Sequence, residues 1–138
     1  GIESKKQLIW DICTKLSRNQ NAIELHGNGT EVRDWIYIKD AVKMLMMVSD
    51  YSENNLKEVP IFNGSSGYHH SVQEILNQIC SYMQLNPLVT FNKITRQGDP
   101  KSLIGSNLKA SQLLGFQPNF DIKSGISEYI EWFKLNDI

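Results

Sequence analysis

Two arginine-bearing segments hold the residue types best suited to binding chemistry. Arg33 stands in an alternating stretch, and Arg96 opens an Arg-x-Gly-Asp sequence that ends at Asp99. A guanidinium forms charge-assisted, often bidentate hydrogen bonds with phosphate or carboxylate oxygens, and a carboxylate accepts hydrogen bonds from hydroxyl groups. Gly98 between them lets the backbone approach a ligand closely. Together these groups suit a diphosphate next to a ribose diol, the pair that a nucleotide sugar presents.

Both arginines also admit a purely structural interpretation. Arg33 would then pair with Asp34 or Asp40 and order a turn, and Arg96 would pair with Asp99 in a loop that caps the following turn. Short motifs recur by chance, and structural ion pairs position charges as often as functional ones do. The residue pattern alone leaves both interpretations open.

Histidines offer weaker candidates for chemistry. His69 and His70 are adjacent, so their side chains point in different directions and at least one is expected to face solvent. His26 is of more interest because it borders the turn that leads to Arg33. The sequence contains no P-loop, no dinucleotide-binding glycine motif after a strand and no Ser or Cys nucleophile motif, and the glycines of 64–67 have the wrong spacing for a dinucleotide.

The composition of the chain limits the kinds of protein that it can be. The chain has 138 residues, of which 41% are hydrophobic and 21% are charged, so we expect one domain with a hydrophobic core. The net charge of −1 does not provide the overall positive charge that favours nonspecific nucleic-acid binding. Cys13 and Cys80 lack disulfide or zinc spacing and are expected to be reduced core residues of a cytoplasmic protein. The longest apolar run, near 44–48, is too short to cross a membrane.

Periodicity predicts a helix-rich α/β or α+β chain with short strands. Helices are expected at 3–18, 40–49, 72–83 and 107–114 and from 122 onward, and strands at 22–25, 59–63 and 88–91. Asn28-Gly29 predicts a two-residue hairpin turn after the first strand. Beyond it, alternation predicts a buried face of Val32, Ile36 and Ile38 and an opposite face of Arg33, Trp35 and Tyr37.

Five segments in this order resemble the C-terminal part of the extended short-chain dehydrogenase/reductases, the NAD-dependent nucleotide-sugar epimerases and dehydratases. Members of the UDP-glucose 4-epimerase-like and dTDP-glucose 4,6-dehydratase-like types show this similarity. The resemblance covers nearly the whole chain. The segments are Gly27-Asn28-Gly29 with Arg33-Asp34-Trp35-Ile36-Tyr37-Ile38-Lys39-Asp40-Ala41, Phe62-Asn63-Gly64-Ser65-Ser66-Gly67, Arg96-Gln97-Gly98-Asp99-Pro100, Lys109-Ala110 through Leu114-Gly115-Phe116-Gln117-Pro118, and Gly125-Ile126 before Trp132.

The resemblance implies roles for the matching residues. Arg33 and Arg96 would contact the diphosphate of a UDP- or dTDP-sugar, Asp99 would hold the ribose, and the stretch that contains Leu25 and His26 would line the base pocket. In that family the NAD loop and the catalytic Tyr-x-x-x-Lys come N-terminal to these motifs. Tyr37-Ile38-Lys39 does not have that spacing. We therefore expect this chain to be the substrate-binding part without the N-terminal Rossmann half, to bind no cofactor by itself and to be inactive alone.

Two further expectations concern the chain as a whole, and the first of them follows from the resemblance. The strand at 59–63 and the helix at 40–49 would pack on the cofactor domain, so the chain alone is expected to dimerise, to swap elements or to be marginally stable. The start at Gly1 without Met is expected of a processed or truncated chain. The alternatives are a non-catalytic nucleotide-sugar-binding module and a structural remnant whose arginines make internal ion pairs.

Overall fold

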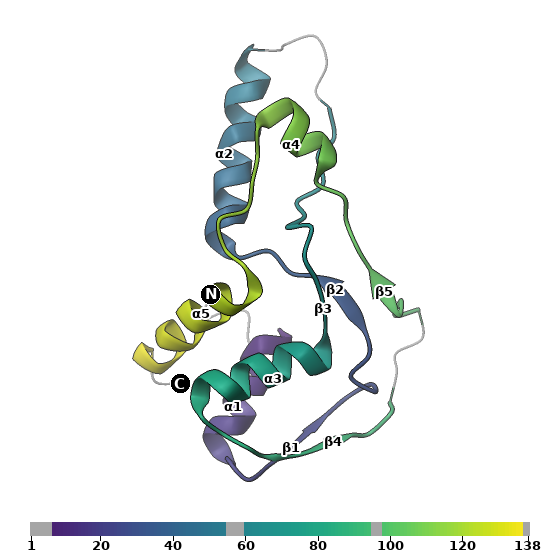
Figure 1. The fold of residues 1–138 in the computed structure, drawn as a ribbon, viewed down its shortest axis with the longest axis vertical. Helices are drawn as coiled ribbons and strands as arrows, with labels where there is room; N and C mark the ends of the chain where they lie inside the picture. Colours follow the sequence, from purple (N-terminus) through teal and green to yellow (C-terminus); the bar gives the residue numbers. More distant parts are fainter. Residues whose placement is uncertain (1–6, 55–59, 95–97, 137–138) are drawn as a thin grey trace.

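The computed structural model describes residues 7–54, 60–94 and 98–136. Over these ranges it is a helix-rich α/β chain, as the sequence predicts (Figure 1). The helices are α1 (Leu8–Arg18), α2 (Ile38–Asn54), α3 (Val72–Met83), α4 (Leu108–Leu114) and α5 (Ile122–Leu135). The strands are β1 (Ala22–Leu25), β2 (Val32–Asp34), β3 (His69–Ser71), β4 (Leu88–Phe91) and β5 (Ser102–Leu103).

The strands form two small sheets that share no strand. β1 pairs with β4 in parallel, with Leu25 opposite Phe91. β2 lies between β3, which is antiparallel to it, and β5, which is parallel. The predicted hairpin after β1 is therefore wrong, because β1 and β2 belong to different sheets. Positive φ falls on Gly27 and Gly29 and not on Asn28, so the backbone does not form the turn that would fold β2 back onto β1.

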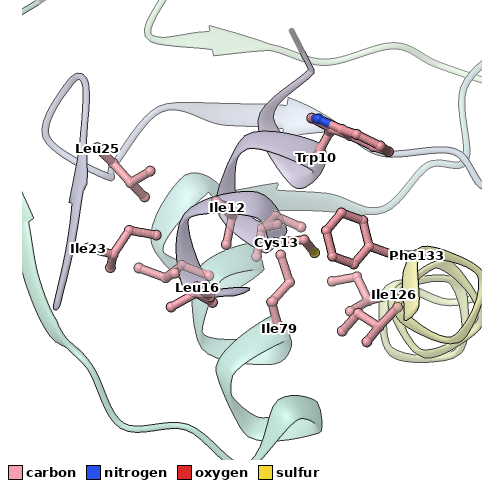
Figure 2. Packing of buried hydrophobic residues seen from close by; sticks show 12 residues of the cluster. Trp10, Ile12, Cys13, Leu16, Ile23, Leu25, Ile79, Ile126 and Phe133 are labelled. Atoms are coloured by element: carbon pink, nitrogen blue, oxygen red, sulfur yellow. The ribbon is translucent and has the colours of Figure 1, made fainter. Parts of the chain in front are cut away.

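The main hydrophobic core lies between α1, α3, α5 and the inner face of β1 (Figure 2). On α1, α3 and α5 the buried residues recur at helical spacing, so each of these helices turns one apolar face into the core. Trp10 closes one end of this core, with its ring centroid 5.3 Å from that of Phe133 in an edge-on contact. Each large apolar side chain removed from water contributes roughly 1.5–3 kcal/mol, so this cluster is the main source of stability of the fold. Its buried members are Trp10, Ile12, Cys13, Leu16, Ile23, Leu25, Ile75, Leu76, Ile79, Ile126, Ile130 and Phe133.

A second, smaller core joins α2 and α4 at the other end of the molecule (Figure 1). Its buried members are Met44, Ala110 and Phe116. Helix α2 is longer than the predicted 40–49, because it starts at Ile38 and runs to Asn54. One face of α2 remains apolar and exposed, including Leu45 at 69% and Met46 at 64% exposure.

Two further predictions are corrected. Residues 60–63 form no strand, and residue 59 lies outside the described residues. In place of a ladder, the Asn63 side chain donates to the Ser106 carbonyl at 3.2 Å. The alternation after Arg33 also fails, because β2 ends at Asp34 and the chain soon turns helical. Ile38 is consequently 64% exposed, while Trp35, predicted for the opposite face, packs against the main core.

Helix ends follow their sequence signals. Ser71 and Glu74 form the predicted capping box at the start of α3. Gly115 ends α4 with φ of 68°, in the left-handed region that glycine favours. Asp121 accepts from the Ser124 amide at the start of α5. The part of the predicted first helix before residue 7 lies outside the described residues.

Candidate functional site

The connection from β1 to β2 is a loop ordered by one carboxylate. Glu31 accepts hydrogen bonds from the backbone amides of Asn28 and Gly29, each at 3.0 Å. Partial burial opposes ionisation of Glu31, but these amides and the nearby Arg33 outweigh it and lower the pKa of the carboxyl group. Gly29 also lies against the Phe91 ring, where an added Cβ would be 2.6 Å from the nearest ring carbon. The loop is therefore held in one conformation at the end of β1.

Arg33 follows this loop in the central strand of the three-stranded sheet. It is half-buried, and its Nη1 donates to the Val32 carbonyl at 2.9 Å. No carboxylate among the described residues lies within ion-pair distance of its guanidinium. The pairing of Arg33 with Asp34 or Asp40 is therefore not the arrangement found. Within the described residues, the bond to Val32 is the hydrogen bond that this guanidinium makes, so most of its donors have no protein partner there.

The two carboxylates proposed as partners of Arg33 are occupied elsewhere. Asp34 accepts from the Ser65 hydroxyl at 2.5 Å and from the Ser66 amide at 2.9 Å. Asp40 is buried and accepts from the amides of Asn119 and Phe120, each at 2.9 Å. Asp34 thus holds the segment of Ser65 and Ser66 in place, and Asp40 holds the segment before α5.

The loop that carries Arg96 and Asp99 begins and ends beside the segment that carries His26 and Arg33. At its start, the Gly27 amide donates to the Ile94 carbonyl at 3.0 Å. At its end, the Val32 amide donates to the Lys101 carbonyl at 2.9 Å, and β5 continues in parallel beside β2. Asp99 itself is exposed. Arg96 lies outside the described residues.

The base-pocket candidates differ in exposure. Leu25 is 2% exposed and belongs to the main core, so its side chain supports the strand from inside. His26, one residue later, is exposed at the carboxyl end of β1. Its ring Nδ1 lies 3.0 Å from Nδ2 of Asn92, the residue that follows β4. Asn92 Nδ2 also donates to Glu24 at 3.1 Å.

The Tyr-x-Lys sequence at the start of α2 has a structural partner. The Tyr37 hydroxyl donates to Glu128 of α5 at 2.9 Å, and Lys39 pairs with the same carboxylate. Burial, and secondarily this hydrogen bond, raises the pKa of Tyr37 to about 12. A tyrosine with a raised pKa is a poor proton acceptor near neutral pH. These residues clamp α5 to α2.

Other kinds of site receive no support in the part of the chain that the structure describes. There, no three His, Cys, Asp or Glu side chains gather as a metal site, and no helix is long and apolar enough to cross a membrane. A polar groove of about 470 Å³ lies between α3 and α5, lined in part by Tyr82, Lys123 and Lys134. The residues that line it come from 78–84 and 123–134, so neither His26 nor Arg33 is among them.

Sequence reasoning missed Glu31 and Asn92, which organise this edge. A signal for Asn92 existed in the strand prediction. Had 22–25 and 88–91 been paired in parallel, the residues following them would have been placed side by side. Glu31 had no comparable signal, because its two amide partners are set by the loop conformation and not by a sequence motif.

Comparison with known proteins defines first the class and then the family. The class is that of the NAD-dependent epimerases and dehydratases, short-chain dehydrogenase/reductases that act on nucleotide sugars. The chain belongs to the family described as GDP-mannose 4,6 dehydratase, whose family model matches residues 2–129. It is 35% identical over 91 residues to the UDP-glucose 4-epimerase of Corynebacterium glutamicum, covering 66% of this chain and 27% of that protein. It is 29% identical over 105 residues to the UDP-glucose 4-epimerase of Rhizobium meliloti, covering 76% and 31%.

Solved structures confirm the fold. The chain is similar to an epimerase from Methanothermobacter thermautotrophicus, with a TM-score of 0.83 and 24% identity over 95% of this chain and 38% of that one. It is also similar to the UDP-glucose 4-epimerase of Thermotoga maritima solved with UDP-glucose, with a TM-score of 0.78 and 19% identity over 99% and 42%. The chain therefore spans less than half the length of these relatives and structures.

Proposed function

We propose that this chain is the nucleotide-sugar-binding part of an NAD-dependent epimerase or dehydratase. It holds the diphosphate and ribose of a UDP- or dTDP-sugar, while the rest of the enzyme holds NAD and the catalytic Tyr/Lys pair. The observation that carries the proposal is that both ends of the loop bearing Arg96 and Asp99 are hydrogen-bonded to the segment bearing His26 and Arg33. Gly27 thereby lies beside Ile94, and Val32 beside Lys101, although these pairs are far apart in the sequence.

We assign a role to each of these residues, and for those that the structure describes the environment supports it. Arg33 and Arg96 bind the diphosphate, and Arg33 is free of a carboxylate partner within the described residues, as an anion site requires. Asp99, exposed in the same loop, accepts from the ribose hydroxyls. His26 lines the base pocket, and Leu25 acts from the core as its support. The solved relatives include a Bacillus cereus UDP-glucuronic acid 4-epimerase in complex with its UDP-sugar and NAD.

No residue of the chain is assigned to NAD. In the Gly64–Gly67 segment, Ser65 and Ser66 are almost fully buried and bind Asp34, which supports leaving this segment out of the proposed ligand sites. The cofactor, when bound elsewhere in the enzyme, supplies hydride transfer at the sugar. The residues of this chain bind and orient the substrate.

Calorimetry tests the arginine assignment. UDP-glucose and dTDP-glucose would be titrated into the whole protein that contains this chain and into the Arg33→Ala/Arg96→Ala variant. A hydrogen bond to a charged group contributes about 1.5–3 kcal/mol, so each arginine lost is expected to weaken binding about 10- to 100-fold. Arg18→Ala, at the exposed end of α1, is the matched control and is expected to bind as the wild type. Full affinity in the double variant would refute the site.

A second assay separates the enzyme from a non-catalytic binding module. The same protein with NAD would be followed for conversion of the bound nucleotide sugar. Conversion supports the enzyme, whereas binding without conversion supports the module.

A further inference from the structure

The polar cluster at the carboxyl ends of β1 and β4 contains a histidine with a fixed neighbour. Glu24 and His26 come from the end of β1, and Asn92 follows β4. The parallel register sets Leu25 opposite Phe91, so His26 and Asn92 are the next residues along the same ladder. Their contact is thus built into the sheet.

The hydrogen bonds of Asn92 assign its side-chain orientation. Its Oδ1 accepts from the Ile94 amide at 3.0 Å. Its Nδ2 donates to Glu24 Oε1 at 3.1 Å and lies 3.0 Å from His26 Nδ1, nearer than Oδ1 is to that nitrogen at 3.4 Å. A flipped amide would lose the Ile94 bond and place its oxygen against the Glu24 carboxylate.

This orientation selects one tautomer of the imidazole. A ring nitrogen that receives an N–H hydrogen bond must carry its lone pair, so the proton of a neutral His26 lies on Nε2. The ring is exposed, and Nε2 has no hydrogen-bond partner among the described residues. His26 therefore offers a donor to a ligand at this edge.

We propose that Asn92 is a positioning residue that holds His26 in its Nε2–H form, so that His26 donates a hydrogen bond to a carbonyl oxygen on the base of the bound nucleotide. This inference rests on the proposed function, since the ligand is the same nucleotide sugar. The carbonyl concerned is the one at the position where cytosine carries an amino group. The site therefore accepts uracil or thymine and disfavours cytosine, because the amino group of cytosine and the Nε2–H of His26 are both hydrogen-bond donors and cannot bond to each other.

Two measurements on the whole protein test this, the first without ligand. Nitrogen-15 NMR of the His26 ring reports which nitrogen carries the proton, and the Nε2–H form is expected in the wild type. The Glu24→Gln/Asn92→Asp variant keeps a hydrogen-bonded cluster but offers Nδ1 an acceptor, so the proton is expected to move to Nδ1. An Nδ1–H ring in the wild type would overturn the proposal.

The second measurement compares UDP with CDP by calorimetry. A single hydrogen bond that is lost or mismatched changes affinity by roughly tenfold, so the wild type is expected to prefer UDP by about that factor. Asn92→Ala is expected to weaken UDP binding about threefold or more and to reduce the preference. The Glu24→Gln/Asn92→Asp variant is expected to reverse it. Asn86→Ala, an exposed asparagine just before β4, is the matched control and is expected to change neither value.

The outcomes distinguish this inference from the proposed function. UDP binding with an unchanged UDP-to-CDP ratio in Asn92→Ala would overturn the role of Asn92 and leave the proposed function standing. If the His26 ring is in its Nε2–H form but the protein binds no nucleoside diphosphate, the proposed function and the base contact are both overturned.

Discussion

Replacement of Asp40 by Ala is expected to loosen the junction between α2 and the segment before α5. Asp40 is 1% exposed, and its two oxygens accept from the backbone amides of Asn119 and Phe120, each at 2.9 Å. Alanine would leave both amides without an acceptor. An unsatisfied buried donor costs about 1–3 kcal/mol; since Asn119 is exposed and Phe120 is half-buried, the expected loss for the two amides together is at the low end, about 2–3 kcal/mol. The carboxylate also lies in the first turn of α2, where negative charge is favourable.

Hydrogen exchange measures this loss locally. If opening of the junction becomes easier by about 3 kcal/mol, the amides of Asn119 and Phe120 exchange roughly 100-fold faster. Asp40→Asn retains one acceptor oxygen and is expected to show a smaller effect. Glu53→Ala, at an exposed position near the other end of α2, is the matched control. Unchanged protection of both amides in Asp40→Ala would refute the argument that this carboxylate holds the junction.

Two other predictions concern the loop before β2 and the exposed face of α2. The ordinary pKa of Glu31, 4.5, is lowered in the fold, where the amides of Asn28 and Gly29 and the charge of Arg33 outweigh the effect of burial. The stability that Glu31 contributes is therefore complete above that value and is lost as the pH falls through the lowered pKa. Urea unfolding should thus show a wild-type advantage over Glu31→Gln near neutral pH that shrinks in acid, and a pH-independent difference would contradict this. For α2, light scattering of the 138-residue chain is expected to show self-association. Leu45→Lys is expected to reduce it, because the apolar side chain of Leu45 is 69% exposed. A monomer that unfolds cooperatively would contradict this prediction.

Local signals in the sequence determined the helices. The 72–83 helix follows from the Ser71–Glu74 capping box and its apolar spacing, and the end of α4 follows from Gly115. These features depend on neighbours within a few residues, so the sequence alone suffices to predict them. The strands at 22–25 and 88–91 were predicted for the same reason. The family resemblance likewise depended on short motifs in order, and the family model confirms it.

Tertiary structure decided which segments meet. Asn28-Gly29 is a strong local hairpin signal, yet β1 pairs with β4, because the inner face of β1 is buried against α1 and α3 and its open edge is filled from later in the chain. The sequence also does not reveal that Arg33 lacks a carboxylate partner within the described residues, since Asp34 is bound by Ser65 and Ser66, which follow α2 in the chain. Side-chain pairing across such separations depends on the three-dimensional path of the backbone. The sequence therefore named candidate groups for the proposed site, and the fold determined that, among the described residues, Arg33 has no carboxylate partner while His26 and Asp99 are exposed.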